Sequence, residues 1–165
     1  MKKLLLVRHA KSDWNDIKLS DFDRPLNDRG QKAAPEMADR LLKKNIIPDH
    51  IVSSPAKRAI TTAKYFAKAF EIDKSSIEQI EAIYEAEANT LLKVINQLDN
   101  KNSFVALFGH NPGITNCAVS LCGTYIGNMP TCALILIEFP FEDWQMISFG
   151  TGNKIMYDFP KSGED

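Results

Sequence analysis

Leu4-Leu5-Leu6-Val7-Arg8-His9 is an apolar run that stops abruptly at an arginine and a histidine. Four consecutive branched aliphatic residues are too few for a helix and show no alternation of apolar and polar side chains. They therefore predict a strand that is buried on both faces, as in parallel sheets covered by helices. Ligands of open α/β sheets bind just beyond the carboxyl ends of the strands, where Arg8 and His9 would lie.

The same arrangement occurs twice more along the chain. Ile51-Val52 leads into Ser53-Ser54-Pro55-Ala56-Lys57-Arg58, and Phe104–Phe108 leads into Gly109-His110-Asn111. Three predicted strands thus end at an arginine or a histidine. Because the carboxyl ends of parallel strands share one edge of a sheet, we expect these side chains to converge.

Helical spacing of apolar residues predicts four helices between and after these strands. Asn27 can cap the first helix, and Ser54-Pro55 supplies a cap residue and a proline for the start of the second. Pro35 interrupts the first pattern, so that helix either kinks there or begins near it. Asn89 or Thr90 can cap the third helix. The helices are expected over about 28–42, 55–70, 90–98 and 114–121, and Gly123 ends the last.

The C-terminal part of the chain predicts antiparallel strands. Thr131–Phe139 is rich in β-branched and aromatic residues, Pro140–Asp143 reads as a turn, and Trp144–Phe149 as a returning strand. Ile77–Ile83 alternates only loosely, and we read Gly150–Lys154 as a turn rather than a phosphate loop. The predicted fold is α/β, a three-layer α/β/α sandwich with a mixed, mostly parallel sheet, in a single domain spanning 1–165.

Composition narrows the possible functions. The 165 residues are 44% hydrophobic and 25% charged, which is typical of a globular protein. Twenty Lys and Arg against 21 Asp and Glu, without a basic block, argue against a nucleic-acid partner. No apolar run is long enough for a membrane span or a signal peptide, so we expect a cytoplasmic protein without a membrane partner.

No cofactor or metal site is expected from the sequence. Cys117, Cys122 and Cys132 lie in apolar surroundings without a zinc-binding pattern, and we expect reduced thiols. No acidic cluster suited to Mg²⁺ accompanies the predicted site. Positive side chains would therefore have to stabilise a bound anion by themselves.

Two arginines and two histidines at converging strand ends suit a phosphoryl group. Guanidinium groups pair bidentately with phosphate oxygens. An imidazole can attack phosphorus and form a covalent phosphohistidine, which divides hydrolysis into two easier displacements. These residues therefore favour phosphoryl transfer without a metal.

Several motifs, taken together, resemble those of the histidine phosphatase (phosphoglycerate mutase-like) superfamily. Its Arg-His-Gly motif would correspond to Arg8-His9-Ala10, with alanine in place of the usual glycine. Within the superfamily, the short chain and three of its segments are more similar to the small phosphohistidine phosphatase (SixA) branch; these segments are Asp23-Arg24-Pro25-Leu26, His110-Asn111-Pro112 and Pro130-Thr131-Cys132-Ala133. The further matching motifs are Ser12 with Trp14-Asn15, Leu26-Asn27-Asp28-Arg29-Gly30, Ser53-Ser54-Pro55 with Arg58-Ala59 and Thr62-Ala63, and Gly109-His110.

The resemblance implies roles for four of the matching residues. His9 would accept the phosphoryl group, Arg8 and Arg58 would bind its oxygens, and His110 would donate a hydrogen bond to them. The acid that the superfamily uses as a proton donor is not evident, because Asn111 follows the second histidine. Glu85 is the candidate acid by order along the chain, and Ser12, Asn15 and Arg24 are further candidates for substrate binding.

The missing acid bears on the substrate. An imidazole leaves more easily than an alkoxide and needs less general-acid help. We therefore expect a substrate that carries phosphohistidine, such as a histidine-phosphorylated signalling domain. One alternative is hydrolysis of a small phosphate ester, with Glu85 as acid and Lys11 or Arg24 selecting the substrate. A catalytically silent phosphoprotein-binding module is another, although binding alone would not require His9.

Overall fold

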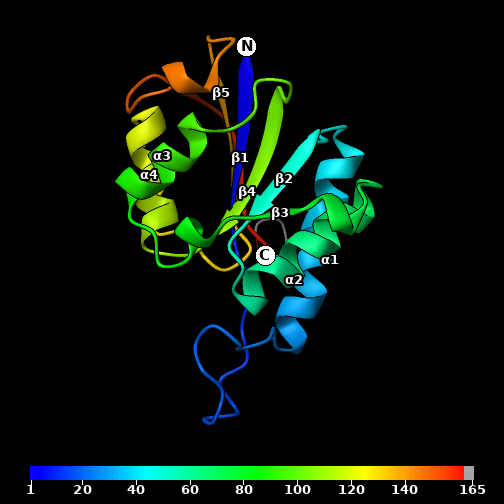
Figure 1. Ribbon diagram of the computed structural model, residues 1–165. Coiled ribbons are helices and arrows are strands. Elements are labelled where there is room, and N and C mark those ends of the chain that lie inside the picture. Colours follow the sequence, from blue (N-terminus) through cyan, green and yellow to red (C-terminus); the bar gives the residue numbers. More distant parts are fainter. Residues whose placement is uncertain (162–165) are drawn as a thin grey trace.

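The computed structural model describes residues 1–161, and within these residues six strands form one sheet (Figure 1). The strand order is β3-β2-β4-β1-β5-β6, which places β1 and β4 in the middle. The strands are β1 (Lys2–Arg8), β2 (His50–Ser53), β3 (Glu78–Gln79), β4 (Phe104–Gly109), β5 (Leu134–Phe139) and β6 (Asn153–Asp158). The helices are α1 (Asp28–Lys43), α2 (Lys57–Ala69), α3 (Ala88–Asn96) and α4 (Gly113–Cys122), with short 3₁₀ turns η1 (Lys74–Ser76), η2 (Glu81–Ile83) and η3 (Trp144–Met146).

The register of the parallel strands aligns their carboxyl ends. β1 pairs with β4 so that Arg8 lies opposite Gly109. β2 pairs with β4 on its other side, with Ser53 opposite Phe108. β5 is antiparallel to β1 and β6 is antiparallel to β5, so the mixed, mostly parallel sheet is confirmed.

Strand β1 is the centre of both halves of the core. Leu4 and Leu6 belong to the cluster that packs against α3 and α4, whereas Leu5 and Val7 belong to the cluster that packs against α1 and α2. Figure 1 shows the two helix pairs on opposite faces of the sheet, which confirms the three layers. All four side chains are fully buried. Each contributes about 1.5–3 kcal/mol to folding through its removal from water.

The predicted helix starts are partly confirmed. The Asn27 side chain accepts a hydrogen bond from the Gly30 N–H and caps α1, which then runs through Pro35 without ending. The Ser54-Pro55 start is wrong, because α2 begins at Lys57. The Ser54 hydroxyl instead lies 2.7 Å from the His110 ring. Neither Asn89 nor Thr90 caps α3, whose cap position is Glu87.

The predicted end of α4 is confirmed. α4 ends where Gly123 adopts the left-handed conformation, with φ of 66°. All three cysteines are free thiols, and burial raises the pKa of Cys117 and of Cys132 to about 12. No helix within residues 1–161 is both long and apolar enough to cross a bilayer.

The predicted hairpin from Thr131 to Phe149 is wrong in its second strand. Residues 144–146 form η3, and β5 pairs with β6 instead. The reason is the Trp144 side chain, which is fully buried and donates a hydrogen bond from Nε1 to the Asn102 carbonyl. The loosely alternating stretch 77–83 contains both β3 and η2. Gly150, with φ of 85°, makes the predicted turn, but β6 already begins at Asn153.

Gly30 joins the loop after β1 to the first turn of α1. A Cβ atom at this position would lie 2.2 Å from the Lys11 carbonyl oxygen, a backbone atom that cannot rotate away. We expect Gly30→Ala to lower the free energy of unfolding by about 1–3 kcal/mol, because the loop must shift to relieve the overlap. Urea denaturation measures the change. Gln31→Ala, at an exposed position of the same helix turn, is the control, and equal stabilities of the two variants would contradict the close packing.

Candidate active site

Arg8, His9, Arg58 and His110 lie together at the carboxyl edge of the sheet. They line one cavity of about 360 Å³. The His9 and His110 ring centroids are 5.2 Å apart, and Arg58 Nε lies 3.4 Å from His9 Nε2. The structure therefore brings together the four residues that the sequence placed at three strand ends.

His9 is held in one orientation by backbone and side-chain contacts. Its backbone N–H donates to the Gly109 carbonyl, and its Nδ1 lies 2.7 Å from the Ala10 carbonyl oxygen. A carbonyl can only accept, so we assign the proton to Nδ1, which leaves a lone pair on Nε2. The Ala10 N–H donates to Thr62 Oγ1, which itself donates to the Arg58 carbonyl. The loop after β1 is thus tied to α2.

Arg58 is positioned by the carboxylate of Asp21. The guanidinium donates from Nη1 to the Asp21 carbonyl at 2.7 Å and from Nη2 to its carboxylate at 3.0 Å. Asp21 also accepts from the Tyr84 hydroxyl at 2.6 Å and pairs with Arg24 at 2.8 Å. Partial burial raises the pKa of Asp21, but the Tyr84 hydrogen bond and the charge of Arg58 outweigh it and lower this pKa to about 2. Asp21 therefore stays ionised and fixes both arginines.

Arg8 and His110 each have a buried nitrogen atom without a hydrogen-bond partner among residues 1–161. Arg8 Nη1 donates to the Met129 carbonyl, whereas Arg8 Nε is buried without a hydrogen-bond partner among residues 1–161. Ser54 Oγ accepts from the Ala56 N–H and lies 2.7 Å from His110 Nε2, and its hydroxyl can donate to this nitrogen. We assign the hydrogen bond in this direction, which places the His110 proton on Nδ1, an atom without a hydrogen-bond partner within the described chain. Buried polar atoms without a partner are rare in folded proteins, and a catalytic role is one explanation for them.

Both histidines are neutral at pH 7. Burial, followed by the neighbouring positive charges, lowers the pKa of His9 to about 3. The same two effects, with Arg58 the largest charge, lower the pKa of His110 to about 4. The Tyr84 hydroxyl has its pKa raised to about 12, by burial and by Asp21. The net positive charge of the cavity therefore comes from its arginines and Lys11, and His9 keeps its lone pair.

The remaining candidate residues are placed differently. Ser12 and Arg24 line the cavity, where Arg24 Nε donates to Ser12 Oγ at 3.1 Å and the guanidinium lies 3.5 Å from the centre of the Trp14 ring. Asn15 is exposed and does not line the cavity. Glu85 is exposed and lines an adjoining hollow with His110 instead.

The sequence assigned no role in this site to Asp21, Tyr84, Thr62 or Ser54, although Ser54 and Thr62 lie in the matching motifs. Thr62 follows Arg58 by four residues and so lies on the same helix face, which is a usable signal. Asp21 and Tyr84 are 63 residues apart in the chain, and no local pattern connects them. Within residues 1–161 no group of three or more His, Cys, Asp or Glu residues is arranged to hold a metal ion.

Comparison with known proteins agrees with the fold and gives the family. The model of the histidine phosphatase superfamily (branch 1) matches residues 4–91, more than half of the chain, and the protein belongs to this superfamily.

Among individual proteins, an uncharacterized chloroplastic protein of Arabidopsis thaliana is 30% identical over 152 residues, which are 87% of this chain and 69% of the relative. A solved structure assigned as the phosphohistidine phosphatase SixA of Agrobacterium tumefaciens is 28% identical, with a TM-score of 0.81 over 96% of this chain and 98% of that one. The structure of the protein histidine phosphatase SixA with tungstate has the same TM-score, 0.81, at 20% identity, covering 97% of this chain and 98% of that one, which supports the shared fold.

The low pKa values of His9 and His110 predict acid sensitivity of the fold. In the unfolded chain each histidine binds a proton near pH 6.5, whereas in the folded protein protonation requires pH of about 3 or 4. Between these values the unfolded state holds more protons, so the free energy of unfolding falls as pH falls, by about 1.4 kcal/mol per pH unit for each histidine. Denaturation at several pH values from 6.5 to 4.5 measures this slope. His9→Gln should have a smaller slope than the wild type, and an unchanged slope would contradict the buried neutral histidine.

Proposed function

We propose that this protein is a metal-independent phosphatase that acts through a covalent phosphohistidine at His9 and removes the phosphoryl group from phosphohistidine in another protein. The observation that carries the proposal is the position of His9 Nε2, which is unprotonated and lies 3.4 Å from Arg58 Nε in a cavity that Arg8 also lines. The nucleophilic atom and the groups that bind phosphate oxygens therefore occupy the same small volume.

In the first step the His9 Nε2 lone pair forms a bond to phosphorus as the bond from phosphorus to the substrate imidazole breaks. The substrate imidazole is already protonated on its other nitrogen before the transfer, so it keeps that proton and departs as neutral imidazole. Arg8 and Arg58 pair with the phosphoryl oxygens, and the His110 N–H donates to them. Asp21 holds the Arg58 guanidinium in the plane that this contact requires.

In the second step a water molecule attacks phosphorus and the bond to His9 Nε2 breaks. The water proton passes to the departing phosphate or to solvent, and His9 returns to the neutral imidazole. Because the Ala10 carbonyl holds the proton on Nδ1 throughout, the same tautomer is regenerated for the next cycle. Each displacement is in line and needs no metal.

The lining of the cavity supports an imidazole leaving group. Its residues are Arg8, His9, Lys11, Ser12, Trp14, Arg24, Arg58, His110, Asn111 and Thr131, and none of these has a carboxylic acid. Glu85, the candidate acid, faces the adjoining hollow. The similarity to the Agrobacterium tumefaciens structure assigned as a phosphohistidine phosphatase supports the same substrate class. A histidine-phosphorylated signalling domain in the cytoplasm would be a suitable partner.

The proposal predicts that His9 becomes phosphorylated during turnover. Wild-type protein should hydrolyse a phosphohistidine peptide with higher kcat/KM than an aryl phosphate, in the presence of EDTA. An acid quench during turnover should trap a phosphoenzyme that is labile in acid and stable in base. His9→Ala should form no phosphoenzyme and lose at least about 10³-fold in kcat, because the covalent route is closed.

Each alternative has its own outcome in this experiment. A higher kcat/KM for the aryl phosphate, with further loss in Glu85→Gln, would favour a small-ester phosphatase. Binding of phosphopeptide without hydrolysis of either substrate would favour a silent binding module. Loss of activity in EDTA would contradict the metal-independent mechanism.

Arg58→Lys separates the charge of Arg58 from its geometry. Lysine keeps the charge but cannot bind two oxygens at once, and it cannot make both contacts to Asp21. We expect kcat/KM to fall by about 10²- to 10³-fold, as for removal of one preorganised contact to the transition state. Steady-state kinetics measures the loss. The control is Lys57→Arg at the exposed neighbouring position, and similar activities of the two variants would place Arg58 outside the reaction.

A further inference from the structure

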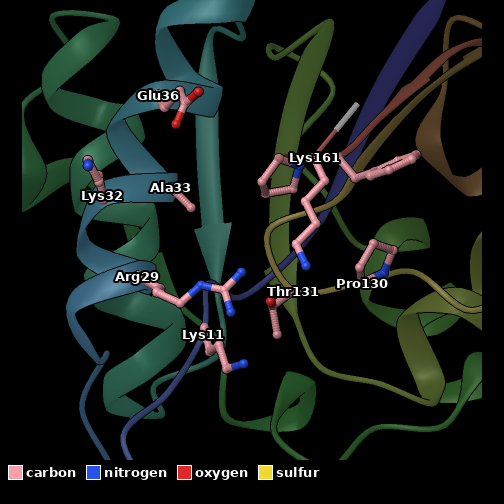
Figure 2. Close-up of a pocket in the computed structure, with 10 residues that line it drawn as sticks. Lys11, Arg29, Lys32, Ala33, Glu36, Pro130, Thr131 and Lys161 are labelled. Carbon is pink, nitrogen blue, oxygen red and sulfur yellow. The ribbon is translucent and has the colours of Figure 1, made fainter. Parts of the chain in front are cut away.

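A second hollow adjoins the catalytic cavity on the side of α1 (Figure 2). Its volume is about 380 Å³, and it shares Lys11 and Thr131 with the catalytic cavity. We call it the α1 pocket. Its lining consists of Lys11, Arg29, Lys32, Ala33, Glu36, Pro130, Thr131, Phe159, Pro160 and Lys161.

The α1 pocket concentrates positive charge in a chain whose net charge is −1. Four of its lining residues are cationic, and Figure 2 shows the side chains of Lys11, Arg29 and Lys161 gathered around Thr131. Among residues 1–161, neither Lys11, Arg29 nor Lys32 pairs with a carboxylate. The single carboxylate of the pocket, Glu36, faces Arg40 at 3.7 Å. The pocket therefore presents uncompensated positive charge to a ligand.

The wall of the α1 pocket is fixed by hydrogen bonds. Arg40 donates to the carbonyl oxygens of Phe159 and Pro160 at 3.0 and 2.8 Å and pairs with Asp158 at 3.2 Å. These contacts hold the segment after β6 against α1. The pocket thus combines a cationic rim with an apolar floor that includes Ala33 and Pro130.

We propose that the α1 pocket binds acidic side chains that flank the phosphorylated residue of a protein substrate. This inference rests on the proposed function and adds the substrate's sequence class to it. The two adjoining hollows favour a protein substrate, because a small ester whose phosphoryl group contacts Arg58 would not also fill a second hollow of about 380 Å³. Carboxylate groups match the cations, and the methylene groups of Glu or Asp match the apolar floor.

The test uses two phosphohistidine peptides that differ only in their flanking residues, Glu in one and Gln in the other. Wild-type protein should show higher kcat/KM for the Glu peptide at low salt, by about three- to tenfold, which is the size expected for two exposed ion pairs. The Arg29→Gln/Lys32→Gln double variant should lose this preference. Neither residue lines the catalytic cavity, so its kcat/KM for aryl phosphate should stay at the wild-type value.

The matched control is Lys64→Gln/Lys68→Gln. These lysines lie on α2 in a separate hollow, and their removal changes the net charge equally. The control should keep the preference for the Glu peptide. Loss of the preference in both double variants would show that the effect depends only on net charge. It would contradict the proposal that the α1 pocket binds acidic side chains. Equal rates for the two peptides with wild-type protein would also overturn it.

Binding separates this inference from the proposed function. The unphosphorylated Glu and Gln peptides are titrated into wild-type protein and into both double variants, so the result does not depend on turnover. Tighter binding of the Glu peptide that is lost only in Arg29→Gln/Lys32→Gln supports the pocket even if phosphohistidine is not hydrolysed. If that variant instead loses activity only on a small ester with two phosphates, the pocket is a second phosphate subsite and the peptide proposal is wrong.

Discussion

The alignment of three parallel strand ends is the constraint on which the site depends. The pairs Arg8 with Gly109 and Ser53 with Phe108 bring the first residues beyond β1, β2 and β4 to one level. A slip of β1 by one residue would turn Leu4 and Leu6 to the opposite helix layer. Every other side chain of β1 would also change to the opposite face of the sheet. Because β1 is buried on both faces, the core opposes that slip strongly. The geometry of the site is therefore fixed by the same apolar contacts that stabilise the fold.

Gathering several cations in one cavity has an electrostatic cost that the site meets in two ways. Two like charges 4 Å apart repel by about 4 kcal/mol at an effective dielectric constant of 20. Asp21 reduces this repulsion by contacting Arg58 and Arg24 together. Burial reduces it further by keeping His9 and His110 neutral. In the proposed reaction, a phosphoryl dianion would meet arginines that are already oriented and a histidine that does not have to lose a proton first.

The sequence predicted those parts of the molecule whose signals are local. The apolar runs before His9 and His110 are strands. Asn27 caps the start of α1 and Gly123 ends α4, as predicted. Errors arose where a distant partner determines the conformation. Ser54 has the chemistry of a helix cap, but its hydroxyl contacts a ring 56 residues away. Trp144 has the propensity of a strand residue, but its burial places it in a 3₁₀ turn.

The same distinction applies to the site. Arg8, His9, Arg58 and His110 follow predicted strands and could be found from sequence. Asp21 lies in a loop whose path depends on Arg58 and Tyr84, so its role was visible only in three dimensions. Asn15, in the same loop, matched a motif but does not line the cavity, and its backbone N–H donates to the Asp13 carboxylate.

The chemistry of the proposed reaction explains why contacts beyond the phosphoryl group matter. Transfer from one imidazole to another exchanges similar bonds, so the reacting atoms offer little basis for choosing among proteins that carry phosphohistidine. Selection must then come from side chains around the phosphorylated residue. At physiological ionic strength charges act over about 8 Å, so a charged subsite is effective only close to the reacting group. Lys11 and Thr131 line both the catalytic cavity and the α1 pocket, which puts the cations of α1 next to the site of phosphoryl transfer.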